Sequence, residues 1–143
     1  MATPTSMPTV SELNEAVTGY DRLYGLRFVS VSDEEVRAEV DVRPEIKQPT
    51  GLVHGGLYAS LAESMTSLAT AVAAMSEGKV ATGMSNNTSF LRPILDGTVH
   101  ARASRLHRGR TTWVWDVTFS DDDGRTCAVT RMTIAVRPYQ DRR

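Results

Sequence analysis

The chain has 143 residues, is 41% hydrophobic and carries a formal net charge of -1, which suits one globular domain with one core. A charge this close to neutral gives no reason to expect a nucleic-acid partner. Cys127 is the single cysteine, so an internal disulfide is excluded and a reducing cytoplasm is the expected compartment. Residues 1–10 are rich in Thr, Ser and Pro and lack the pattern of a secretion signal, so we expect a flexible arm there and a single domain over residues 11–143.

The first predicted elements are a helix and a hairpin. Residues 11–23 have weak helical character, with Ser11 and Glu15 near the start. From Leu26 the hydrophobic period changes to two, which predicts strands over residues 26–31 and 36–41 joined by a turn at residues 32–35.

A long helix is predicted after Gly55 and Gly56. Residues at helical spacing are apolar and their neighbours are apolar or small, namely Leu57, Leu61, Met65, Leu68, Val72, Tyr58, Ala62, Ala69 and Ala73. We therefore expect other elements to wrap this helix. The span is rich in Ala, Ser, Thr and Gly and holds Glu63 near its middle, which argues against a transmembrane helix.

After Gly78 the period of two returns and predicts four strands, over residues 80–91, 98–106, 113–119 and 126–136. Asp123-Gly124 is a hairpin turn signal before the last strand. We expect these strands to form a meander. The predicted fold class is α+β, with an antiparallel sheet curled around one central helix.

Glu63 is the only formal charge in residues 48–76. A carboxylate inside a long apolar helix is expected to have lost much of its water, and isolated buried acids often serve chemistry. A structural acid paired with a distant arginine is the alternative, and the residue alone does not decide between the two.

Three segments together resemble the hotdog-fold acyl-CoA thioesterases: Gly51-Leu52-Val53-His54-Gly55-Gly56, Leu61-Ala62-Glu63-Ser64 and Ser85-Asn86-Asn87-Thr88-Ser89-Phe90-Leu91-Arg92-Pro93. Within that family they are most similar to the branch of the Arthrobacter-type 4-hydroxybenzoyl-CoA thioesterase and the phenylacetate-pathway thioesterases. Segments 109–113 and 134–138 extend the resemblance over residues 26–138.

The resemblance implies that Glu63 is a nucleophile or a general base. Gly55 begins the helix, where backbone N–H groups lack partners and the helix dipole is positive, so its N–H is expected to polarise the thioester carbonyl. Tight packing of the loop is the alternative reason for these glycines. Ser67, one turn beyond Glu63, is expected to orient the carboxylate or the attacking water. Ser60 and Ser64 are interpreted as ordinary small helix residues.

Gln48 matches a family position that contacts substrate, although a solvated loop glutamine is an equal alternative. We expect His54 to anchor the loop by a hydrogen bond, and His54 and Gly56 to border the substrate. No metal site is expected, because His54, His100 and His107 have no ligand-like spacing. No cofactor is expected.

Coenzyme A needs cationic and hydrogen-bonding contacts for its phosphates. The resemblance assigns these to Arg92, Arg110, Thr111 and Thr112. Arg108 could equally belong to a solvated face. Some relatives carry an arginine where this chain has Gln140, and Arg142 and Arg143 could replace it.

The expected activity is hydrolysis of an aromatic acyl-CoA, similar to 4-hydroxybenzoyl-CoA, by a homodimer or homotetramer. A non-catalytic acyl-CoA-binding protein and a hotdog hydratase or dehydratase are the alternatives. The hydratase would be expected to show a catalytic histidine in its own motif, and the chain has no such motif.

Overall fold

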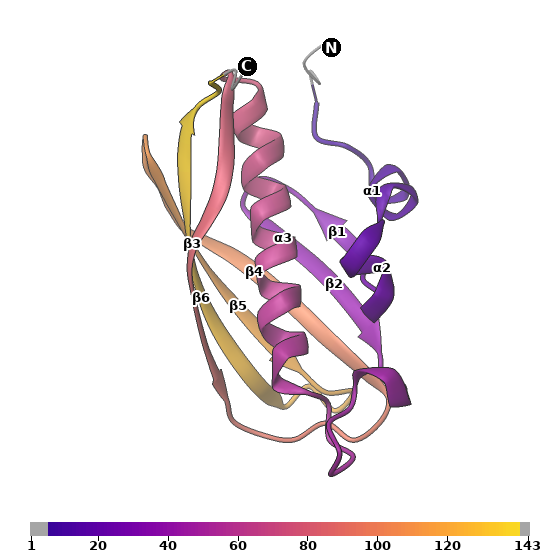
Figure 1. Cartoon of the computed structure of the whole chain (residues 1–143). Coiled ribbons are helices and arrows are strands. Elements are labelled where there is room, and N and C mark those ends of the chain that lie inside the picture. The colour runs from indigo at the N-terminus through magenta and orange to yellow at the C-terminus, as the bar shows by residue number, and fades with distance from the viewer. Residues whose placement is uncertain (1–5, 141–143) are drawn as a thin grey trace.

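In the computed structural model, which describes residues 6–140, six antiparallel strands form one strongly twisted sheet in the order β1-β2-β4-β5-β6-β3 (Figure 1). The strands are β1 Arg27–Val31, β2 Glu35–Asp41, β3 Lys79–Phe90, β4 Thr98–Arg108, β5 Thr112–Ser120 and β6 Thr126–Pro138. The helices are α1 Val10–Ala16, α2 Gly19–Tyr24, the 3-10 helix η1 Pro44–Ile46 and α3 Gly55–Met75. The long helix α3 lies along one face of the sheet, which confirms the predicted fold class.

The core lies between α3 and the sheet, where the period-two residues meet the helix. The predicted inward side chains of β2, β4 and β5 are all buried, namely Val36, Ala38, Val40, Val99, Ala101, Ala103, Trp113, Trp115, Val117 and Phe119. From α3, Leu61 and Met65 are fully buried against them. Trp115 donates its indole N–H to Thr70 Oγ1 at 3.0 Å, so the one polar atom of this large side chain is satisfied inside the core.

The predicted order of the last four strands is wrong. β4, β5 and β6 do form a meander, but β3 pairs with β6 at the far side of the sheet, and β4 pairs with β2. The helix α3 separates the two halves of the sheet in the chain, so β3 can enter at the far edge while β4 crosses back to the hairpin. The single weak helix predicted over residues 11–23 is also wrong, since α1 and α2 are separate helices.

The amino-terminal helix α1 begins inside the predicted arm, because Thr9 caps it by accepting a hydrogen bond from the Glu12 N–H. Residues 1–5 of that arm lie outside the described range. Further along α1, the Asn14 carboxamide accepts from the Phe28 N–H at 2.7 Å and donates to the Phe28 carbonyl at 3.0 Å. The side chain therefore occupies both backbone groups of a residue in the edge strand β1, where a neighbouring strand would otherwise pair.

The opposite edge of the sheet, β3, lacks such protection. β3 pairs only with β6 among the described residues, and residues 80–91 contain no charged side chain. Most of its residues are exposed, including Met84, at 54%, and Phe90, at 60%. A long, uncharged and exposed edge strand is a template for pairing with another chain.

Within residues 6–140 no helix is both long and apolar enough to span a membrane.

Candidate active site

The amino-terminal end of α3 opens into a cleft of about 480 Å³. Its walls come from three segments that are distant in the sequence: the loop before α3, the first turns of α3, and the end of β3 with the loop after it. The lining residues are Gln48, Leu52, Val53, His54, Gly55, Tyr58, Phe90, Leu91, Arg92 and Pro93. Burial raises the pKa of Tyr58 to about 12, so its side chain stays neutral. Most of the cleft surface is apolar, since Leu52, Val53, Phe90, Leu91 and Pro93 line it, with polar groups at a few positions.

Backbone hydrogen bonds build the two loops of the cleft. In the first loop, the Gln48 N–H donates to the Leu52 carbonyl at 2.8 Å and the Gly51 N–H donates to the Gln48 carbonyl at 2.9 Å. Gly51 has φ of +88°, a conformation that L side chains rarely adopt, so glycine is required for this turn. In the second loop, the Leu91 and Arg92 N–H groups both donate to the Cys127 carbonyl, which places Arg92 at the rim of the cleft.

The start of α3 leaves one backbone donor available to a ligand. His54 is the N-cap residue, and its Nδ1 accepts a hydrogen bond from the Gly56 N–H at 2.8 Å. The Leu57 N–H donates to the His54 carbonyl, while the Gly55 N–H donates to none of the described residues. A Cβ on Gly55 would lie 2.8 Å from the Phe90 ring, so glycine also permits close packing there. Both interpretations of Gly55 are therefore compatible with its surroundings.

Glu63 differs from the sequence prediction. The side chain is exposed in the single chain, not buried, because it lies on the side of α3 that faces the edge strand β3. Its Oε1 lies 3.5 Å from the position that a Cβ on Gly83 would take. Next to it the pairing of β3 with β6 is interrupted between Gly83 and Ser85, and such irregularities are frequent beside active sites. The Asn86 side chain bonds the Ala59 carbonyl at 2.9 Å and ties β3 to the preceding turn of α3.

The serines of α3 have different surroundings. Ser67 is partly exposed one turn beyond Glu63, on the same side of the helix. The interpretation of Ser60 and Ser64 as ordinary small residues is wrong, since Ser60 bonds the Tyr20 hydroxyl and Ser64 donates to Asp21. Both partners belong to α2, about forty residues earlier in the chain, and no local pattern pairs them with α3.

The two halves of the predicted catalytic apparatus lie apart within one chain. Gly55 and Glu63 are eight residues apart on α3, which corresponds to about 12 Å along the helix axis. Glu63 does not line the cleft that holds Gly55 and Gln48. A carbonyl bonded to the Gly55 N–H therefore cannot also contact Glu63 of the same chain.

The predicted phosphate contacts are also divided between the two ends of the molecule. Arg92 borders the cleft, while Arg110, Thr111 and Thr112 lie in the β4–β5 hairpin, at the end of the molecule where α3 ends (Figure 1). Within residues 6–140, Arg92 and Arg110 form no ion pair. Arg142 and Arg143 lie outside the described residues.

Arg108 is engaged in the same hairpin region. It pairs with Asp33 and Glu77 and lies 4.7 Å from the centroid of the Trp113 ring. These contacts explain Arg108 as a structural residue that joins β4 to the β1–β2 turn and to the end of α3.

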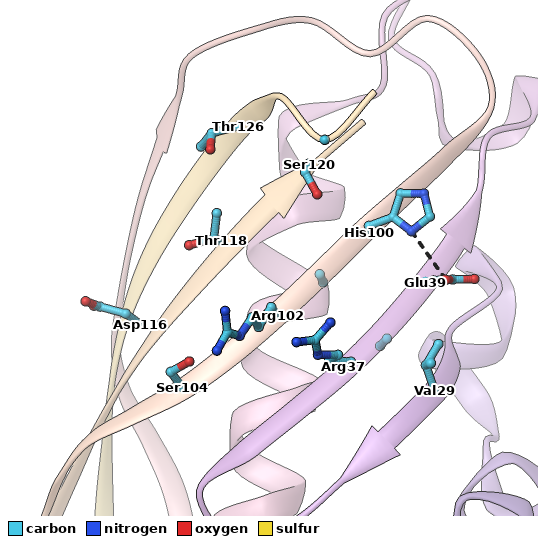
Figure 2. A pocket seen from close by; sticks show the side chains of 13 residues that line it. Val29, Arg37, Glu39, His100, Arg102, Ser104, Asp116, Thr118, Ser120 and Thr126 are labelled. Atoms are coloured by element: carbon cyan, nitrogen blue, oxygen red, sulfur yellow. Dashed lines mark ion pairs between the residues drawn. The ribbon is translucent and has the colours of Figure 1, made fainter. Parts of the chain in front are cut away.

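A second groove, of about 410 Å³, lies on the face of the sheet that points away from α3 (Figure 2). Arg37 and Arg102 point into it side by side, and both pair with the one Glu35 carboxylate. His100 lies between two carboxylates, Glu39 and Asp122. Both arginines are thus already bound to a carboxylate, and no helix start among the described residues opens here, so the cleft at α3 is the stronger candidate site. Residues 6–140 contain no group of three or more His, Cys, Asp or Glu residues that could hold a metal ion.

Comparison with known proteins identifies the family of the chain. A family model described as the thioesterase superfamily matches residues 50–128, which include Gly55, Glu63 and all of α3. The chain belongs to the thioesterase superfamily. The prediction of a hotdog-fold thioesterase is therefore confirmed at the level of the family.

Individual members of the superfamily are similar over most of the chain. The 1,4-dihydroxy-2-naphthoyl-CoA hydrolase of Escherichia coli is 35% identical over 111 residues, which cover 78% of this chain and 81% of that protein. The crystal structure of a mutant thioesterase PA1618 from Pseudomonas aeruginosa is 34% identical with a TM-score of 0.89, and the match covers 96% of this chain and 100% of that one. Thioesterase HI1161 from Haemophilus influenzae is 28% identical with a TM-score of 0.89, over 99% and 100% of the two chains.

Proposed function

We propose that the protein hydrolyses aromatic acyl-CoA thioesters to the free acid and coenzyme A, in a site formed by two copies of the chain. The observation that carries this proposal is the Gly55 N–H, a backbone donor without a described partner at the start of a 21-residue helix, inside an apolar cleft. The E. coli relative named for 1,4-dihydroxy-2-naphthoyl-CoA supports an aromatic acyl group. The aromatic side chains of Tyr58 and Phe90 in the cleft agree with it.

The chemistry follows from one donor and one carboxylate. The thioester carbonyl accepts a hydrogen bond from the Gly55 N–H, and this bond strengthens as negative charge develops on the oxygen. Either Glu63 attacks the carbonyl carbon and expels the CoA thiolate, leaving an anhydride that water cleaves, or Glu63 takes a proton from water as the water attacks. In both routes the thiolate gains a proton, and the acid and the CoA thiol leave.

The second chain supplies the missing half of each site. Because Gly55 and Glu63 are about 12 Å apart along α3, one carbonyl reaches both only if they come from different chains. Antiparallel pairing of two β3 edges would cover this exposed strand, which is uncharged after Lys79, in both copies. It would also place the α3 start of one copy beside the middle of the other copy's α3.

The same pairing reconciles the divided phosphate contacts. An antiparallel arrangement reverses the partner, so the end that carries Arg110 in one copy lies beside the end that carries Arg92 in the other. Arg92 and Arg110, both free of ion pairs among the described residues, would then bind the phosphates of one coenzyme A together. Exposed charge contacts of this kind weaken with added salt.

The test is a panel of acyl-CoA esters assayed for release of the free thiol, with the wild-type protein and Glu63→Gln. The amide is nearly isosteric with the carboxylate but is neither a nucleophile nor a base, so we expect a folded protein that has lost turnover by about 1,000-fold or more. Glu15→Gln is the control, because it makes the same change at an exposed carboxylate of α1. Near-normal hydrolysis by folded Glu63→Gln would remove Glu63 from the mechanism.

A further inference from the structure

The short helix α2 is fastened to α3 next to Glu63. The hydroxyl groups of Tyr24 and Ser64 both donate to Oδ1 of Asp21, at 2.8 Å and 2.6 Å. The Tyr24 side chain is 5% exposed, and burial raises the pKa of this phenol far above its ordinary value, so it remains a neutral donor. One carboxylate oxygen thus joins a buried anchor of α2 to the residue that follows Glu63.

This attachment fixes the position of Tyr20. Ser60 Oγ donates to the Gly56 carbonyl at 2.7 Å, so it accepts the second hydrogen bond, also 2.7 Å, from the Tyr20 hydroxyl. The rings of Tyr20 and Tyr24 meet edge to face, with their centroids 5.2 Å apart. The Tyr20 side chain is therefore held at both its ring and its hydroxyl, although the residue is 62% exposed.

Tyr20 is held on the side of α3 that carries the catalytic residues. Successive helix residues are about 100° apart, so Ser60, Glu63 and Ser67 lie within about 60° of one another around the axis. The hydroxyl of Tyr20 bonds the first of these three residues. Leu23, three residues later on α2 and 73% exposed, extends the same apolar surface.

An exposed aromatic ring held in one orientation beside a reacting carboxylate is suited to bind a flat apolar group. We infer that Tyr20 determines acyl specificity, its exposed ring forming a wall of the acyl subsite beside Glu63 and contacting the ring of an aromatic acyl group. This inference rests on the proposed function. Aromatic rings attract each other in edge-to-face or offset contacts, whereas an acetyl group is too short to extend from the carbonyl to this wall.

The experiment compares kcat/KM for benzoyl-CoA and acetyl-CoA, the slower ester being measured at higher enzyme concentration. Tyr20→Ala should lower kcat/KM for benzoyl-CoA about tenfold, a typical effect for one apolar contact in a substrate pocket, and leave acetyl-CoA nearly unchanged. Tyr20→Phe keeps the ring and should retain most of the benzoyl-CoA activity. Val29→Ala is the control, because Val29 is also exposed, at 46%, but lies on the edge strand β1 and lines the groove on the sheet face away from α3.

Three results would overturn the inference. An equal loss on both esters would show that Tyr20 supports the fold or the position of Glu63. No loss on either ester would show that the ring does not contact the acyl group, and so would an equally large loss in Val29→Ala. The proposed function fails separately, if the wild-type protein releases thiol from no CoA ester of the panel.

Discussion

Replacing Gly55 by proline removes the proposed oxyanion donor and leaves the helix start intact. Gly55 is the first residue of α3, the helical position where proline is best tolerated, because its missing N–H would have no intrahelical partner there. The preceding residue, His54, has φ of -63° and ψ of 132°, the extended conformation that a residue before proline prefers. A Cβ at this position would lie 2.8 Å from the Phe90 ring, so the substitution is made in a Phe90→Ala background.

Loss of one backbone oxyanion donor should lower kcat by about 100-fold to 1,000-fold. Gly55→Ala in the same background is the control, since it adds the Cβ but keeps the N–H, and it should stay within a few-fold of Phe90→Ala. The assay is thiol release from the best ester of the panel, with circular dichroism and thermal melting to establish that all three proteins fold. If Gly55→Pro were as active as Gly55→Ala, the Gly55 N–H would not polarise the carbonyl, and the glycine would serve packing alone.

Three further outcomes are expected. Asn14→Ala should lower the free energy of unfolding by about 1–3 kcal/mol in urea titrations, because both backbone groups of Phe28 lose their partner; a change below that of the neighbouring Glu15→Ala would contradict this. Arg110→Ala should raise KM for the full CoA ester, and the increase should be larger at low salt than at high salt. It should leave KM unchanged for a short thioester that lacks the nucleotide. Equal effects on both esters would show that Arg110 does not bind the phosphates. The unfolded chain releases the Tyr24 proton above about pH 10, while the folded chain keeps it because burial raises the pKa of the phenol. The free energy of unfolding should therefore fall as the pH rises past 10, and it should fall less steeply in Tyr24→Phe. Parallel pH profiles of the two proteins would show that the pKa of the Tyr24 phenol is not raised in the folded chain.

The sequence predicts the local elements well because hydrophobic period is a local signal. Alternation at Trp113, Trp115, Val117 and Phe119 predicts a half-buried strand, and all four side chains are buried in β5. The order of strands in the sheet is not a local signal, because the hydrophobic alternation of β3 is the same whether β3 pairs with β4 or with β6. The pairing with β6 depends on where α3 delivers the chain, and no residue of β3 alone encodes that position.

The sequence motifs propose residues for the site but do not carry its geometry. Gln48, His54, Gly55 and Arg92 do meet in one cleft, as their motif suggests. The apolar neighbours of Glu63 in the sequence predict a buried side chain, but the exposure of a helical side chain depends on which side of the helix the sheet leaves open. The contacts of Ser60 and Ser64 with α2 have no local sequence signal for a related reason, since Tyr20 and Asp21 reach these serines only when the amino-terminal helices pack against α3.

The central claim is that each reacting centre takes Gly55 from one chain and Glu63 from another, and complementation between two inactive variants tests it most directly. Chains with Glu63→Gln and chains with Gly55→Pro and Phe90→Ala are co-expressed with different tags, and the mixed dimer is purified through both tags. In a shared arrangement one of its two sites is wholly wild type, so the mixed dimer should show about half of the wild-type turnover although both parents are inactive. If each site were built from one chain, every site in the mixed dimer would carry a defect, and the mixed dimer would be as inactive as its parents.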